Sequence, residues 1–189
     1  MLLEGKHILL GISGGIAAYK TPLLIRLLVN AGAEVQVVAT QNALQFVTPL
    51  TLETVSNHKV YTDAFGTITE RSTTHISYAQ WADILLIAPA TANSIAKFAG
   101  GIADNALSTQ FLAFDKKVLI APSMNSQMYA HAAVQNNLKT LRERGVILID
   151  PDYGALACGT AGQGRMPEPE ALFETVVQTF STRLQKKKS

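Results

Sequence analysis

The sequence predicts an α/β fold, built on a doubly wound, mostly parallel open sheet with helices on both faces. Five short apolar segments recur along the 189 residues. Each is nearly continuous rather than alternating, which is typical of strands buried on both faces of a parallel sheet. Segments with helical spacing lie between them, and the length suits one core, so we expect a single domain over residues 1–189.

The apolar segments give the expected strands, which are residues 8–12, 35–39, 84–88, 118–121 and 146–149. Their Val, Ile and Leu content favours extended backbone, and their length of four or five residues is too short for a buried helix. Parallel strands need crossover connections, and these are right-handed almost without exception.

Helices are expected from the spacing of apolar residues between the strands. The first covers residues 16–28, with Pro22 kinking it or loosening its first turns. A second helical pattern follows the third strand and breaks near Gly100, and a third ends before Gly145. The last helix is expected at about 168–184.

Composition and charge exclude several classes of protein. The net charge is +2, and three of the positive charges form the terminal run Lys186–Lys188, so the rest of the chain has no basic surplus for nucleic acid. One cysteine permits neither an internal disulfide nor a cysteine metal site. No apolar stretch approaches the ~18 residues of a membrane span, and the N-terminus is too polar for a signal peptide. We expect a cytoplasmic protein with no metal, membrane or nucleic-acid partner.

The ligand site is expected at the carboxyl edge of the sheet. Leu-Ile-Ala-Pro closes both the third and the fourth strand, and the prolines Pro89 and Pro122 mark where these strands leave the ladder. Ligands of open α/β sheets bind beyond this edge, where the strand order reverses. The loops that start at Gly11, Thr40 and Asp150 complete the set to be considered.

The first loop, residues 11–16, is rich in glycine and leads directly into a helix, an arrangement that favours binding of an anion such as phosphate. A plain strand-to-helix turn has the same composition. No Gly-Lys-Ser/Thr follows, the G-x-G-x-x-G spacing is absent, and the second strand ends in Thr40 rather than an acidic residue. These observations disfavour a P-loop and NAD, and they favour a mononucleotide such as FMN.

The loops after the third and fourth strands carry short polar side chains. Thr91, Asn93 and Ser94 are helix-capping residues, and together they also suit the polar end of a flavin ring. Asn125 is able to cap a helix or to donate to a carboxylate. Met124 and Met128 are expected to be packing residues.

Two further residues are candidates for acid–base chemistry. His75 is expected in a loop, where most histidines are surface residues, but its near-neutral pKa makes it the default candidate. The only cysteine, Cys158, lies in the glycine-rich stretch 150–167, which lacks periodicity and is expected to be a lid or binding loop.

Taken in order, these motifs resemble the homo-oligomeric flavin-containing cysteine decarboxylase family, and the resemblance runs from about residue 6 to 180. It rests on the stretches 11–20 (GISGGIAAYK), 75–76 (HI), 89–97 (PATANSIAK), 101–105 (GIADN), 122–125 (PSMN) and 157–166 (ACGTAGQGRM). The resemblance implies a flavoprotein of Rossmann-like or flavodoxin-like fold. It further implies a carbon–carbon lyase with FMN that converts phosphopantothenoylcysteine to phosphopantetheine in coenzyme A biosynthesis, through transient oxidation to a thioaldehyde.

The resemblance also implies roles for individual residues. His75 is expected to assist the oxidation, Asn125 to hold the substrate carboxylate and Cys158 to deliver the last proton. The clamp at about 150–167 is expected to touch substrate through Ala155, Ala157 and Met166. The expected FMN contacts come from Ser13, Gly14, Gly15, Ile16, Thr40, Gln41, Asn42, Thr91, Ala92, Asn93, Ser94 and Ser123.

Family members form trimers, some assembled into dodecamers, and a phosphopantothenoylcysteine synthetase, fused or separate, is an expected partner. Three alternatives stay open on the sequence. The first is a decarboxylase of C-terminal peptidyl cysteine, the second a flavin prenyltransferase, and the third a flavin-binding regulatory subunit without activity. The combination of His75, Asn125 and Cys158 favours the decarboxylase of phosphopantothenoylcysteine.

Overall fold

The structure is a computed structural model that describes residues 1–62, 74–155 and 161–186, the side chains of 155 and 182–186 excepted. Its centre is a five-stranded sheet in which every pairing is parallel. The strand order is β2-β1-β3-β4-β5, the flavodoxin-like order of doubly wound sheets, and this confirms the predicted fold class. The strands are β1 (His7–Ile12), β2 (Glu34–Ala39), β3 (Ile84–Ala90), β4 (Lys117–Pro122) and β5 (Ile147–Leu148).

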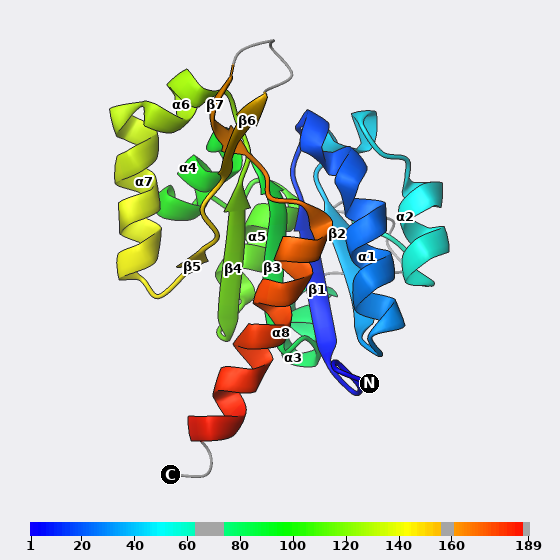
Figure 1. Cartoon of the computed structure of the whole chain (residues 1–189). Coiled ribbons are helices and arrows are strands. Elements are labelled where there is room, and N and C mark those ends of the chain that lie inside the picture. The colour runs from blue at the N-terminus through cyan, green and yellow to red at the C-terminus, as the bar shows by residue number, and fades with distance from the viewer. Residues whose placement is uncertain (63–73, 156–160, 187–189) are drawn as a thin grey trace.

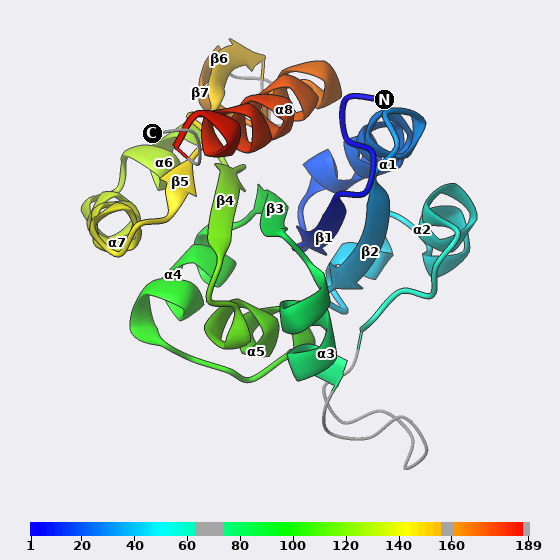
Figure 2. The ribbon, with the colours of Figure 1, turned by 90° about the horizontal axis from the view of Figure 1, so that it is seen from below.

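Helices cover both faces of this sheet (Figures 1 and 2). One face carries α1 (Thr21–Asn30) and α8 (Pro169–Lys186), with α2 (Pro49–Ser56) packed against α1. The opposite face carries α3 (Thr74–Trp81), α4 (Ala92–Gly100), α5 (Ala106–Ala113) and α7 (Ala132–Glu143). The shorter segments are η1 (Ile16–Lys20), η2 (Ala43–Gln45) and α6 (Ser126–Ala130).

Each of the strands β1 to β4 contributes to two hydrophobic cores, one on each face. In β1, Ile8, Leu10 and Ile12 belong to the core under α1 and α8, whereas Leu9 belongs to the core under α3, α4, α5 and α7. All four side chains are fully buried. Full burial of each such side chain stabilises the fold by about 1.5–3 kcal/mol, which explains why the strands are continuous apolar runs.

The first predicted helix is wrong in one respect, because residues 16–28 do not form one helix with a kink. They form η1 and then α1, and Pro22 lies in the first turn of α1. Proline is well accepted there, since the first turn of a helix needs no backbone N–H donor within the helix. The predicted break near Gly100 is confirmed, and Gly101 ends α4 in the left-handed region with φ +72°.

The stretch 150–167 contains more regular structure than predicted. Strands β6 (Asp152–Ala155) and β7 (Ala161–Arg165) form an antiparallel pair beside the main sheet (Figure 1). Strands are predicted from an alternation of apolar and polar side chains, and this hairpin lacks that alternation because several of its positions are glycine: Gly154, Gly162 and Gly164. The segment between the strands, 156–160, lies outside the described residues.

Candidate functional site

A cavity of about 530 Å³ opens at the carboxyl edge of the sheet, where the loops after β1, β2, β3 and β4 converge. The volume lies in the range of roughly 300–1,000 Å³ typical of small-molecule and cofactor sites. Its lining is Gly14, Gly15, Thr40, Gln41, Asn42, Thr62, Thr91, Ala92, Asn93, Ser94, Lys97, Asn105, Ser123, Met124 and Met128. A cavity thus lies where the ligand site was predicted, and binding of a ligand there stays a prediction.

The loop after β1 approaches the loop after β2 so closely that one position has room only for glycine. A Cβ built on Gly14 would lie 2.4 Å from Cβ of Asn42 and 2.8 Å from its carbonyl carbon. At Gly15 the nearest atom to such a Cβ is Cγ2 of Thr91, at an ordinary distance of 3.5 Å. Gly14 thus lets two walls of the cavity meet.

Ser13 fixes the loop after β1 to the loop after β3. Its side chain is 1% exposed, and Oγ donates to the carbonyl of Pro89 at 2.8 Å and accepts from N–H of Thr91 at 2.9 Å. Ser13 itself is not among the residues that line the cavity. It is a structural neighbour of the cavity rather than part of its surface.

Thr91 both lines the cavity and begins α4. It is the N-cap of that helix, and Oγ1 accepts from N–H of Ser94 at 3.3 Å. The capping function predicted for this loop is confirmed, and it holds Ala92 and Asn93 at the helix start where they face the cavity.

Lys97 is the only charged residue in the described lining of the cavity. Its Nζ donates to both carboxylate oxygens of Asp104, at 2.8 and 2.6 Å. This hydrogen bond lowers the pKa of Asp104 below its usual 3.8. The rest of the described lining consists of amide, hydroxyl, thioether and methyl groups and of backbone, a composition that suits a ligand held by hydrogen bonds and apolar contacts.

Most residues predicted to contact FMN line the cavity. The loop residues at 14, 15, 40–42, 91–94 and 123 are all present in its surface, whereas Ser13 and Ile16 are not. The cavity is also lined by Thr62, Lys97 and Asn105, which were not predicted. The last two belong to the motif stretches 89–97 and 101–105, which was a usable signal, whereas nothing in the sequence around Thr62 pointed to a site.

Asn125 is not among the residues that line the cavity. It is the N-cap of α6, and Oδ1 accepts from N–H of Gln127 at 2.8 Å. The preceding residue, Met124, lines the cavity together with Met128. The packing role predicted for the two methionines is thus incomplete: Met124 also packs against a hydrophobic core, but Met128 is 49% exposed.

His75 lies in α3, so the prediction of a loop is wrong. Helix α3 packs against α5, and the buried Gln110 donates from Nε2 to the backbone carbonyl of His75 at 3.1 Å. The helix was not predicted because its apolar residues show no single-sided pattern. His75 is half-buried and is not among the residues that line this chain's cavity.

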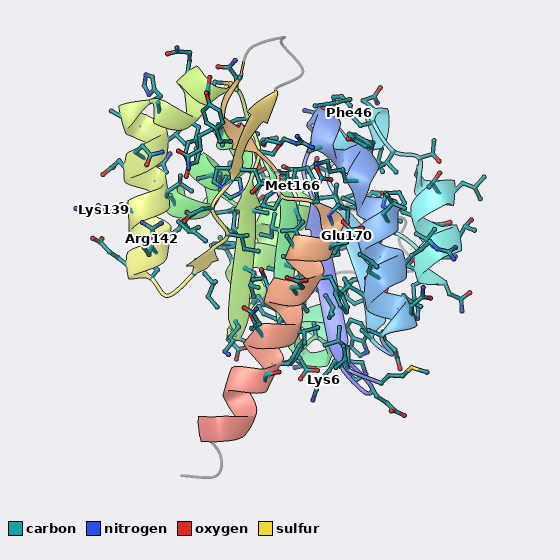
Figure 3. All side chains as sticks on the ribbon, viewed as in Figure 1. Lys6, Phe46, Lys139, Arg142, Met166 and Glu170 are labelled. Carbon is teal, nitrogen blue, oxygen red and sulfur yellow. The ribbon has the colours of Figure 1, made fainter. Side chains whose placement is uncertain are left out.

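The residues predicted to form the clamp have different positions. Cys158 and Ala157 lie outside the described residues. Ala155 is the last residue of β6. Met166 is 1% exposed and belongs to the core under α8, and it is absent from the cavity lining. Its side chain is seen at the N-terminal end of α8 in Figure 3.

None of the helices that the structure describes is long and apolar enough to cross a membrane. In the same part of the chain, no group of three or more His, Cys, Asp or Glu residues is arranged to hold a metal ion.

Comparison with known proteins gives relatives over almost the whole chain. It is 49% identical over 183 residues to the coenzyme A biosynthesis bifunctional protein CoaBC of Haemophilus influenzae, covering 97% of this chain and 46% of the relative. It is 46% identical over 181 residues to CoaBC of Escherichia coli K12, covering 96% of this chain and 45% of the relative. The chain thus spans about half the length of the curated relatives it matches.

Solved structures agree with this result. A PPC decarboxylase variant complexed with pantothenoylaminoethenethiol has a TM-score of 0.83 and 34% identity, over 93% of this chain and 98% of that one. The FMN binding protein AtHal3 has a TM-score of 0.81 and 34% identity, over 94% of this chain and 97% of that one. The family model named Flavoprotein matches residues 2–181, and the chain belongs to the flavoprotein family.

Proposed function

We propose that this chain binds FMN and decarboxylates phosphopantothenoylcysteine to phosphopantetheine, the decarboxylase step of coenzyme A biosynthesis. The observation that carries the proposal is the cavity: it lies at the carboxyl edge of a flavodoxin-like sheet, and Lys97 is the only charged residue in its described lining. The similarity to CoaBC proteins and to a PPC decarboxylase supports the reaction and the substrate.

The residues of the cavity fit FMN. Gly14 and Gly15 bring backbone against the space, and Gly14 has no room for a side chain. The side chains of Thr91, Asn93 and Ser94 are uncharged, and they offer hydrogen-bond donors and acceptors to the isoalloxazine ring of the flavin. Bound FMN would supply a two-electron acceptor for the thiol-bearing carbon of the substrate.

Asn125 is suited to orient the substrate carboxylate. Its Oδ1 accepts from the N–H of Gln127 in the cap of α6, and the Nδ2 amide is the group of this side chain that is able to donate to a carboxylate. A neutral amide positions the carboxylate without strongly stabilising its negative charge, and decarboxylation requires that charge to leave. Cys158 is proposed to deliver the final proton from the hairpin connection.

The position of His75 favours an active site shared between subunits. His75 is absent from the lining of its own chain's cavity, so we propose that it serves the cavity of a neighbouring copy in a trimer. Ile16, Tyr19 and Leu23 on η1 and α1 are each more than half exposed, and apolar residues at this spacing suit burial between copies. Phe46 is exposed at the same end of the molecule (Figure 3). We further propose that trimers assemble into a dodecamer, and that a phosphopantothenoylcysteine synthetase, fused or separate, is a partner of the chain.

One experiment tests the reaction and its rivals together. FMN-loaded protein is incubated with phosphopantothenoylcysteine, with a peptide ending in cysteine and with a prenyl phosphate, and the products are identified by mass spectrometry. We expect phosphopantetheine and carbon dioxide from the first substrate only. Turnover of the peptide or prenylation of the flavin identifies the corresponding alternative, and no turnover of any substrate supports a regulatory subunit.

A second experiment tests the shared site. His75→Gln and Asn125→Asp chains are each expected to be inactive, and hybrids formed by mixing them are expected to regain activity, because some cavities then combine an intact His75 with an intact Asn125. Hybrids that stay inactive after verified subunit exchange contradict the shared site.

A further inference from the structure

Lys20 is an unusual residue for its position. Of the charged side chains that the structure describes, it is the only buried one, with 5% of its surface exposed. Burial of an ammonium group is costly unless strong acceptors surround it. Its acceptors therefore indicate which parts of the chain must stay together.

The acceptors of Lys20 lie at the other end of the chain, between β7 and α8. Nζ donates to the backbone carbonyl of Met166 at 3.2 Å and to Oε1 of Glu168 at 2.9 Å. Glu168 also accepts from Arg165, the last residue of β7. The Lys20 hydrogen bond is the main reason that the pKa of Glu168 lies below its usual 4.5.

On its own side, Lys20 is the last residue of η1, which begins directly after the Gly14–Gly15 loop of the cavity. Ala17 and Ala18 of η1 are buried, and the hydroxyl of Thr21 donates to the carbonyl of Ala18 at 2.8 Å. This end of the contact is fixed by packing independently of Lys20.

The hairpin has a second anchor near the cavity. The N–H of Met124, which lines the cavity, donates to the carbonyl of Gly164 in β7 at 3.0 Å. Gly164 has φ +140°, and a Cβ built on it would lie 2.3 Å from the carbonyl oxygen of Met124. Strand β7 is thus fixed to the loop after β4 at Gly164, and to η1 two residues later at Met166.

We propose that Lys20 is a positioning residue that sets the β6–β7 hairpin relative to the cavity, by joining the segment after β7 to the helix after the Gly14–Gly15 loop. The inference rests on the proposed function, because the hairpin is taken to act on the substrate. Lys20 itself is not among the residues that line the cavity. Its contribution is to hold the Met166 backbone and Glu168 in one place, so that β7 has one register against Met124.

The test uses Lys20→Met, which keeps the length of the side chain and removes its charge and donors. Lys139→Met is the matched control, because the Lys139 side chain is 71% exposed on α7 and its ion pair with Glu143 is long, at 3.9 Å (Figure 3). Hydrogen exchange of the amides of residues 161–165 is measured by mass spectrometry on the FMN-loaded, oligomeric protein. We expect at least tenfold faster exchange in Lys20→Met and no change in the control.

Steady-state kinetics add a readout that a merely structural role does not move. We expect the KM for phosphopantothenoylcysteine to rise at least fivefold in Lys20→Met, with kcat and the Kd for FMN within twofold of the unchanged protein. Equal losses in kcat, FMN binding and thermal stability would mean that Lys20 only supports the fold, and this overturns the proposal. Unchanged exchange and unchanged KM also overturn it.

Glu168→Ala provides a second variant in case Lys20→Met does not fold. Glu168 is half exposed, and its removal leaves Lys20 with the Met166 carbonyl alone. We expect a smaller change of the same kind, faster exchange in β7 with a raised KM. Hydrogen exchange is measured without substrate, so it tests the role of Lys20 independently of the reaction. Failure of the unchanged protein to release carbon dioxide would overturn the proposed function, but it would leave this test of Lys20 intact.

Discussion

The contact between Gly14 and Asn42 makes FMN affinity sensitive to a single methyl group. In Gly14→Ala, the added Cβ lies 2.4 Å from Cβ and 2.8 Å from the carbonyl carbon of Asn42. Such distances require the backbone of the Asn42 segment to move. In the free variant, the Asn42 segment moves and the overlap is relieved. FMN fits the cavity only when this segment is in its original position, so binding FMN brings the overlap back.

The magnitude follows from the cost of overpacking, which is typically about 1–3 kcal/mol. At about 1.4 kcal/mol per tenfold change in affinity, the Kd for FMN is expected to rise roughly 5- to 150-fold. The measurement is a titration of flavin-free protein with FMN, followed by quenching of flavin fluorescence. Thermal unfolding of the same samples reports on the fold.

Gly100→Ala is the matched control, because Gly100 is the last residue of α4, outside the cavity lining, and an added Cβ meets only Ile102 at 3.8 Å. We expect its Kd for FMN to equal that of the unchanged protein. If Gly14→Ala also binds FMN with unchanged affinity, the Gly14–Asn42 contact is not a wall of the FMN site, and the reasoning from this cavity fails.

Three other changes test separate parts of the proposed chemistry. Asn125→Asp keeps a good N-cap for α6 but places a negative charge against the substrate carboxylate. We expect thermal unfolding to stay the same while turnover is lost, and unchanged turnover contradicts the role of Asn125. Cys158→Ala is expected to stop after loss of carbon dioxide and to accumulate an oxidised enethiol product in the mass spectrum, and full conversion to phosphopantetheine removes Cys158 from its role. Glu168 has a pKa below 4.5 in the folded chain, so its contribution to stability is present above 4.5 and is lost as the pH falls through the folded value. Denaturant unfolding should therefore lose stability on acidification more steeply in the unchanged protein than in Glu168→Gln, and identical slopes contradict this.

The parallel sheet was predictable because its strands are buried on both faces. Residues 8–12 and 84–88 are continuous apolar runs, and their burial follows directly from that composition. The carboxyl edge was predictable from the two prolines, although only Pro122 is the last residue of its strand: β3 continues one residue beyond Pro89, to Ala90, which pairs with Pro122. The loops at this edge then had to meet.

Other features depend on contacts between distant residues and leave little trace in a single sequence. Helix α3, which carries His75, owes its place to packing against α5 and to Gln110 rather than to an apolar stripe of its own. In the hairpin β6–β7, Gly164 leaves room for the backbone carbonyl of Met124, and this close contact between distant residues cannot be inferred from the sequence. Lys20 reads as one more polar residue of a helix until Glu168 appears beside it.

The central claim is that the cavity at the carboxyl edge of the sheet holds FMN and performs a decarboxylation. It is tested most directly by mixing FMN-loaded protein with phosphopantothenoylcysteine labelled in its carboxylate carbon, and counting the label released as carbon dioxide. We predict stoichiometric release of label with formation of phosphopantetheine in the unchanged protein, and none in Asn125→Asp. Protein that holds FMN in this cavity and yet releases no label would contradict the account.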